Sequence, residues 1–170
     1  MVVWIIGLSG AGKTTLARRV VDECKRSASN VVLIDGDEVR AMFGDDLGHT
    51  LADRRKNAER ICRLCKFMDD QGIHVVCAIL SLFPESREWN RRNLENYYEV
   101  FIDTPIGDLQ SRDSKGIYAR YAAGQIKDVA GLDLEFQRPD ADLLIENRGS
   151  RDEFLGYASR ISAKVLGRPE

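Results

Sequence analysis

The chain has 170 residues, which is the usual size of one domain. Its 25 Lys and Arg residues are balanced by 27 Asp and Glu residues, so the formal net charge is −2. A polynucleotide-binding protein usually carries a basic excess and is therefore disfavoured. No apolar run approaches the roughly 18 residues that span a bilayer, and a strand-like run begins directly at Val2, so we expect a cytoplasmic protein without a membrane segment.

The expected secondary structure alternates between strands and helices along the whole chain. Apolar runs and apolar periodicity predict, in chain order, a strand over 2–6, a helix over 13–27, strands over 31–35 and 73–80 separated by a helix over 51–71, a helix over 85–95, strands over 98–103 and 142–146, and a helix over about 150–166. Continuous apolar strands separated by helices are typical of a parallel sheet covered on both faces. We therefore expect a three-layer α/β fold with a mostly parallel five-stranded sheet.

One segment does not fit this alternation. Residues 113–138 contain no strand pattern and are rich in Gly, Lys, Arg and Asp. We interpret them as a mobile lid with one short helix near 117–123, within a single domain of residues 1–170.

The cysteine spacing favours a packing role. Cys62 and Cys65 form a C-x-x-C pair, a spacing found in zinc and redox sites. Both positions lie on the apolar face of the helix expected over 51–71, and the chain has no second such pair and only two His. We interpret the pair as small buried hydrophobic residues in a reducing compartment.

The strongest motif follows the first predicted strand. Gly7-Leu8-Ser9-Gly10-Ala11-Gly12-Lys13-Thr14 matches the phosphate-binding loop pattern G-x-x-x-x-G-K-[ST]. Such a loop points backbone N–H groups at phosphates, while Lys13 reaches the β- and γ-phosphates and Thr14 holds Mg²⁺. The sequence therefore predicts a P-loop fold that binds a nucleoside triphosphate and Mg²⁺ through Gly7, Ser9, Gly10, Ala11, Gly12, Lys13, Thr14 and Thr15.

A second charged motif ends the strand expected over 31–35. Asp35, Asp37 and Arg40 follow one another at the carboxyl end of that strand, which we predict to neighbour the first strand. An Asp in this place can position Mg²⁺ or orient an attacking hydroxyl. The alternative reading is an ordinary strand-to-helix turn capped by an Asp.

Five segments occurring in this order resemble the adenylylsulfate kinases: 7–15, 35–40, 53–57, 112–118 and 124–133. The resemblance runs from about residue 2 to residue 147. Members of that family transfer the γ-phosphoryl group of ATP to the ribose 3′-hydroxyl of adenosine 5′-phosphosulfate. The resemblance thus implies ATP and Mg²⁺ as cofactors, a small-molecule nucleotide acceptor and a homodimer.

The resemblance also implies roles for individual residues. Asp37 corresponds to the residue that accepts the 3′-hydroxyl proton, and Lys13 and Asp35 complete the catalytic group, with Asp35 near the metal. A clamp on the acceptor's ribose and charged 5′ group is implied for Arg40, Arg54 and Asn57. The remaining implied contacts are Ser81 and Lys127 with the acceptor, and Arg112 and Lys115 from the closing lid with ATP.

The sequence departs from the family pattern where the acceptor base binds. Two phenylalanines stack on adenine in the family, whereas this chain has His49 and Val129 at those positions. Each base–aromatic stack contributes about 1–3 kcal/mol. A smaller base is therefore our hypothesis, and the chain also resembles a divergent branch that phosphorylates cytidine diphosphoramidate during capsule phosphoramidate synthesis.

Other readings remain open at this point. His49 can stack on adenine well enough to keep adenylylsulfate as the acceptor. A non-nucleotide acceptor such as a sugar is another possibility. A catalytically inactive nucleotide-binding regulator is opposed by the intact set Lys13, Thr14, Asp35 and Asp37.

Overall fold

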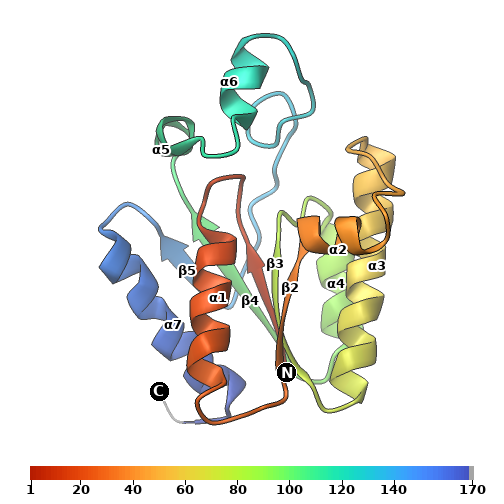
Figure 1. Cartoon of the computed structure of the whole chain (residues 1–170), viewed down its shortest axis with the longest axis vertical. Helices are drawn as coiled ribbons and strands as arrows, with labels where there is room; N and C mark the ends of the chain where they lie inside the picture. The colour runs from red at the N-terminus through yellow and green to blue at the C-terminus, as the bar shows by residue number, and fades with distance from the viewer. Residues whose placement is uncertain (169–170) are drawn as a thin grey trace.

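The computed structural model describes residues 1–168, and its centre is a sheet in which every strand runs parallel to its neighbours (Figure 1). The strands are β1 (Val2–Ile6), β2 (Val31–Asp35), β3 (His74–Ile79), β4 (Tyr97–Asp103) and β5 (Leu143–Glu146), in the spatial order β2-β3-β1-β4-β5. The helices are α1 (Lys13–Cys24), α2 (Gly36–Met42), α3 (Leu51–Asp70), α4 (Pro84–Asn93), α5 (Ile106–Arg112), α6 (Ile117–Ala122) and α7 (Arg151–Val165). The predicted α/β fold is confirmed, and the sheet is entirely parallel.

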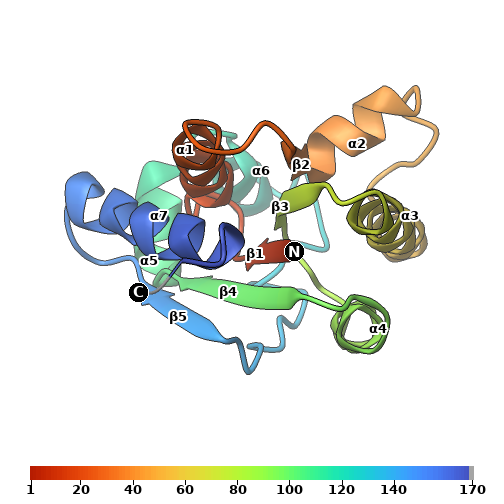
Figure 2. The same ribbon diagram turned by 90° about the horizontal axis from the view of Figure 1, so that it is seen from below.

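The alternating side chains of β1 build one core on each face of the sheet. Val3 and Ile5 belong to a buried cluster with residues of α1 and α7. Trp4 and Ile6 belong to a second buried cluster that includes Ile61 of α3. Successive side chains of a strand point to opposite faces, so this continuous apolar strand supports both layers. Figure 2 shows α1 and α7 on one side of the sheet and α3 and α4 beyond the other.

The prediction that β2 neighbours β1 is wrong. β3 lies between them, because Cys77 pairs in register with Trp4 on one side and with Ile34 on the other. β3 is almost completely buried, and the centre of the sheet is where both faces are covered. Asp35 therefore leaves the sheet one strand further from the phosphate loop than expected.

α5 was not predicted from the sequence, and α2 was indicated only by the alternative reading of an Asp-capped strand-to-helix turn, which the structure confirms. α2 begins with Gly36, and α5 follows Pro105 and contains Gly107. Glycine disfavours helix, and both segments are too short to show helical periodicity. α2 forms because the Asp35 side chain accepts a hydrogen bond from the Asp37 backbone N–H, as an N-cap does.

The cysteine prediction is confirmed. Cys24, Cys62, Cys65 and Cys77 are all free and buried. Within residues 1–168 no group of three or more His, Cys, Asp or Glu side chains is arranged to hold a metal ion.

No helix in that range is long and apolar enough to cross a membrane.

The segment 113–138 rises beyond the carboxyl edge of the sheet. It contains α6, as expected, together with an isolated bridge between Ala130 and Leu134. Figure 1 shows α5 and α6 above the loop that joins β1 to α1, with the chain then descending behind the sheet to β5. The segment thus lies where a lid over that loop belongs.

Candidate active site

The loop that joins β1 to α1 adopts backbone angles that favour glycine. Gly10 has a φ of 78° and Gly12 a φ of 98°, both in the left-handed region. A Cβ on Gly7 would lie 3.1 Å from the backbone oxygen of Ile102. The loop therefore curls closely above the sheet, as a phosphate-binding loop requires.

A cavity of about 660 Å³ opens beside this loop. Its walls come from the loop itself, α2, the α2–α3 connection, α3, the segment after β3 and the lid. The predicted site residues that line it are Ser9, Gly10, Gly12, Lys13, Thr14, Thr15, Asp35, Asp37, Arg40, His49, Arg54, Asn57, Ser81 and Lys115. Residues from six separate parts of the sequence are thus brought to one cavity.

Other predicted site residues do not line this cavity. Gly7 and Ala11 belong to the phosphate loop but lie behind its lining, and Ala11 is fully buried. Arg112 and Lys127 are exposed. Val129 is only 6% exposed and packs in the core cluster shared with α1 and α7. His49 therefore lies in the cavity wall, whereas the Val129 side chain packs in the core.

Lys13 is the first residue of α1, and its pKa is lowered. Its Nζ donates a hydrogen bond to the backbone oxygen of Leu8 at 2.8 Å. Burial and the nearby positive charge of Lys115 lower the pKa of Lys13 to about 8, although Asp35 and Asp37 act in the opposite direction. An anionic ligand in the loop would restore the charged form.

Thr14 and Asp35 connect α1 to the end of β2. Thr14 Oγ1 donates a hydrogen bond of 2.6 Å to Asp35 Oδ2, while Asp35 Oδ1 accepts the N-cap hydrogen bond from Asp37. Both contacts leave lone pairs on the hydroxyl and carboxylate oxygens. Oxygen donors of this kind, one or two carboxylates completed by substrate phosphates, fit Mg²⁺.

Asp37, in the first turn of α2, is bound by the lid. Lys115 Nζ lies 2.6 Å from Asp37 Oδ2. Burial alone would raise the pKa of Asp37, but the Lys115 hydrogen bond and the charges of Lys115, Lys13 and Arg40 outweigh it and lower this pKa below its usual value. Asp37 is therefore a carboxylate, able to accept a proton once Lys115 moves away.

Two arginines fasten the α2–α3 connection. Arg40 Nη1 donates a hydrogen bond of 2.6 Å to the backbone oxygen of Gly48, and Arg54 Nε donates one of 2.8 Å to the backbone oxygen of His49. Burial lowers the pKa of Arg54, partly opposed by Asp128 and Asp133 of the lid. The remaining guanidinium N–H groups are available to an anion in the cavity.

Two buried polar atoms beside the cavity have no hydrogen-bond partner within the described part of the chain. They are Arg40 Nε and Asn57 Oδ1. The other end of the Asn57 amide is fixed, because Nδ2 donates a hydrogen bond of 3.1 Å to the backbone oxygen of Gly36. Most buried polar atoms in proteins are paired, so this end of the cavity is suited to a polar ligand.

The segment after β3 carries a constrained serine. Ser81 is buried and has a positive φ of 54°, a conformation rare outside glycine. Its Oγ accepts a hydrogen bond of 3.0 Å from Trp4 Nε1, and its backbone oxygen accepts one of 3.2 Å from Arg87 Nη1. A residue of β1 and a residue of α4 thus hold this wall of the cavity in place.

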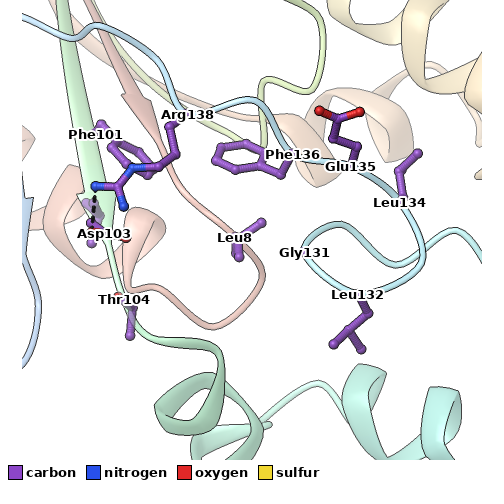
Figure 3. A pocket seen from close by; sticks show the side chains of 11 residues that line it. Leu8, Phe101, Asp103, Thr104, Gly131, Leu132, Leu134, Glu135, Phe136 and Arg138 are labelled. Carbon is purple, nitrogen blue, oxygen red and sulfur yellow. Dashed lines mark hydrogen bonds and ion pairs between the residues drawn. The ribbon is translucent and has the colours of Figure 1, made fainter.

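The end of the lid is anchored to the phosphate loop at a second, smaller cavity of about 300 Å³ (Figure 3). Figure 3 shows Leu8 facing the turn at Gly131, where a Cβ would lie 2.8 Å from Leu8 Cδ1. Further along, Arg138 pairs with Asp103 at 2.8 Å. The segment 131–138 therefore forms a fixed base for the lid.

The cavity also has walls that the sequence did not indicate. Asp45, Ala58 and Leu82 line it, and none belongs to a motif that predicts nucleotide binding. Only their positions next to His49, Asn57 and Ser81 could have suggested them.

The profile of the adenylylsulphate kinase family matches residues 1–146. This chain belongs to the adenylylsulphate kinase family. It is 37% identical over 149 residues to the cytidine diphosphoramidate kinase of Campylobacter jejuni, with 86% of this chain and 85% of that protein covered. It is 38% identical over 149 residues to the adenylyl-sulfate kinase of Geotalea daltonii, with 86% of this chain and 73% of that protein covered.

A solved structure of the same adenylylsulphate kinase family agrees with the fold. The APS kinase CysC of Mycobacterium tuberculosis, in complex with AMPPNP and APS, superposes with a TM-score of 0.85 at 34% identity, covering 98% of this chain and 96% of that one. As a family member, this chain is an ATP-dependent phosphotransferase that acts on small-molecule nucleotides.

Proposed function

We propose that the protein transfers the γ-phosphoryl group of ATP to the ribose 3′-hydroxyl of a nucleotide of the cytidine 5′-diphosphoramidate type. The observation that carries the choice of acceptor is that His49 lines the cavity, whereas Val129 is buried in the core. A base in this cavity has one imidazole to stack on and no second ring from position 129, which favours a smaller base than adenine.

The relatives are compatible with this choice. The cytidine diphosphoramidate kinase of C. jejuni matches the chain over 85% of its own length, the G. daltonii adenylyl-sulfate kinase over 73%. The identities are nearly equal, so they support a nucleotide acceptor without separating cytidine from adenosine. The wall of the cavity at His49 makes that distinction in our proposal.

The transfer step follows from the placement of Asp37. The 3′-oxygen of the acceptor attacks the γ-phosphorus, the bond between that phosphorus and the β–γ bridging oxygen breaks, and ADP leaves. The proton of the 3′-hydroxyl passes to the Asp37 carboxylate, which its cationic neighbours keep ionised. Lys13 and Lys115 line the same cavity and in this proposal stabilise the charge that develops on the transferred group.

Mg²⁺ fits the oxygen atoms of Thr14 and Asp35, and its chemistry is to neutralise charge on the β- and γ-phosphates. The remaining contacts are assigned by position. Arg40, Arg54 and Asn57 clamp the ribose and the charged 5′ group of the acceptor. Free guanidinium N–H groups of the two arginines suit phosphate oxygens, whereas the free Asn57 Oδ1 suits a ribose hydroxyl. Ser81 and Lys127 contact the acceptor, and Arg112 of the lid contacts ATP.

Adenylylsulfate is the second candidate acceptor, because His49 is in the wall and an imidazole can stack on adenine. An inactive nucleotide-binding regulator is disfavoured because the residues that the proposal assigns to transfer are present and in contact: Thr14, Asp35, Asp37 and Lys115.

The test is ADP release measured separately with cytidine 5′-diphosphoramidate, adenylylsulfate and a sugar acceptor. We expect kcat/KM to be at least tenfold higher for the cytidine compound, and 3′-deoxycytidine 5′-diphosphoramidate to be inert. A higher value for adenylylsulfate would reassign the acceptor. Tight ATP binding without transfer to any acceptor would support the regulator. The homodimer implied by the family is tested by light scattering during gel filtration.

A further inference from the structure

The connection between α2 and α3 presents one carboxylate to the cavity without a partner. Asp45 lines the cavity together with His49 and Arg54. Asp35 and Asp37, which also line it, are engaged by Thr14 and Lys115. Within residues 1–168 the Asp45 side chain has no hydrogen bond or ion pair.

The neighbouring Asp46 shows that this arrangement is specific to position 45. Asp46 accepts two hydrogen bonds from Arg60, of 3.0 and 2.7 Å, and that guanidinium also lies 4.2 Å from the centre of the Phe43 ring. Asp46 is therefore bound to α3, whereas Asp45 lines the cavity.

The backbone holds Asp45 in a defined place. Its N–H donates a hydrogen bond of 3.1 Å to the backbone oxygen of Arg40, and its φ is 53°. Asp and Asn tolerate this left-handed conformation better than most residues. Arg40 also binds the backbone of Gly48, so both sides of the connection are fastened to α2. The backbone of Asp45 is thus held in place beside the cavity, with its exposed carboxylate available to a ligand.

The position of Asp45 suits the base of the acceptor. Asp37 lies in the first turn of α2, whereas Asp45 follows the end of this seven-residue helix. At about 1.5 Å per residue, the helix ends are separated by about 9 Å. With the 3′-hydroxyl at Asp37, a nucleoside lying along α2 brings the edge of its base toward Asp45 and His49.

The hydrogen-bonding chemistry of a carboxylate determines which edge of a base Asp45 can bind. A carboxylate only accepts hydrogen bonds, so it binds an exocyclic amino group and opposes a carbonyl oxygen at the same place. Asp accepts from cytosine N4 in nucleic-acid recognition, and adenine carries an equivalent donor at N6, whereas uracil and hypoxanthine present oxygens. Resting on the proposed function, we propose that Asp45 selects acceptors whose base carries an exocyclic amino group.

The test measures acceptor binding, so that it does not depend on turnover. Protein loaded with AMPPNP and Mg²⁺ is titrated by calorimetry with the 5′-diphosphoramidates of cytidine and uridine, and with adenylylsulfate and its inosine counterpart. The two cytidine and uridine compounds form one pair, and adenylylsulfate and its inosine counterpart form the other. In whichever pair binds more tightly, we expect the Kd of the amino-bearing compound to be about ten- to a hundredfold lower than that of the keto-bearing compound.

Asp45→Asn keeps the left-handed backbone but can donate to a carbonyl oxygen, so the preference should fall below threefold because the keto-bearing compound gains affinity. The matched control is Asp46→Asn, which breaks the pair with Arg60 outside the cavity and should retain the preference. An unchanged preference in Asp45→Asn, or equal loss in both variants, would overturn the inference. A base preference without any phosphoryl transfer would instead refute the proposed function and leave the role of Asp45 standing.

Discussion

Lys115 Nζ lies 2.6 Å from Asp37 Oδ2, so a lysine of the segment 113–138 is ion-paired with the carboxylate that we propose as the acceptor of the substrate proton. In this proposal the ion pair opens before the proton is transferred. The triphosphate of ATP is the natural competitor for Lys115, because it carries more negative charge than one carboxylate. Nucleotide binding would then free Asp37.

Replacing Lys115 by Met should raise the KM for ATP and shift the acid limb of the pH profile. Asp37 has a lowered pKa, chiefly because the Lys115 hydrogen bond and charge outweigh burial. The ionised base is thus present down to low pH in the native protein, and removing Lys115 moves the acid limb of kcat/KM upward. Steady-state profiles of Lys115→Met and of Arg120→Met, an exposed control on α6, would check this. Coinciding limbs in the native protein and Lys115→Met would contradict the contact's effect.

Asp37→Asn should separate binding from chemistry. An amide cannot accept the 3′-hydroxyl proton as a base, so kcat should fall by about 10²- to 10⁴-fold. ATP should bind at least as tightly, because Lys115 loses its competing carboxylate. Single-turnover rates and calorimetric Kd values measure the two effects independently. A variant with near-native turnover would remove Asp37 from its assigned role.

Nucleotide binding should take up protons near pH 8. Lys13 has a pKa of about 8 because of burial and the charge of Lys115. A bound triphosphate raises this pKa, so about half a proton is absorbed per ATP at pH 8 and progressively less toward pH 6. Calorimetry in buffers of different ionisation enthalpy reports the number directly. Lys13→Met provides the control, and an enthalpy independent of buffer would argue against the lowered pKa.

His49→Phe should move the acceptor preference toward adenylylsulfate by about tenfold, since it replaces the imidazole with one of the two phenyl rings that the family pattern places against adenine. Adding Val129→Phe is expected to destabilise the fold by about 1–3 kcal/mol, because Val129 is packed in the core and a larger ring overfills it. Ratios of kcat/KM for the two acceptors, with thermal unfolding of each variant, test both statements. A ratio unaffected by His49→Phe would show that this position does not choose the base.

The sheet could be predicted from the sequence because each strand is a continuous apolar run between helices. The order of the strands could not, since β3 takes the place beside β1 only through packing on both faces. α2 was indicated only by the alternative reading of Asp35 as a helix cap, because its stability comes from that cap and not from periodicity.

The residues of the site were likewise predictable from the sequence only where their motif is local. Gly10, Gly12, Lys13 and Thr14 were evident because their motif is local, and the structure places them beside one cavity. Asp45 was missed, because it reaches the cavity through a loop whose course depends on Arg40 and Arg54. The burial of Val129 is likewise a tertiary property that the family pattern does not specify.

The most direct test of the proposed function is a competition. Equal concentrations of cytidine 5′-diphosphoramidate and adenylylsulfate are incubated with the protein, Mg²⁺ and limiting ATP, and the products are resolved by phosphorus NMR and mass spectrometry. The account predicts that the 3′-phosphorylated cytidine compound exceeds 3′-phosphoadenylylsulfate at least tenfold. An excess of 3′-phosphoadenylylsulfate, or phosphorylation at any position other than the 3′-hydroxyl, would contradict it.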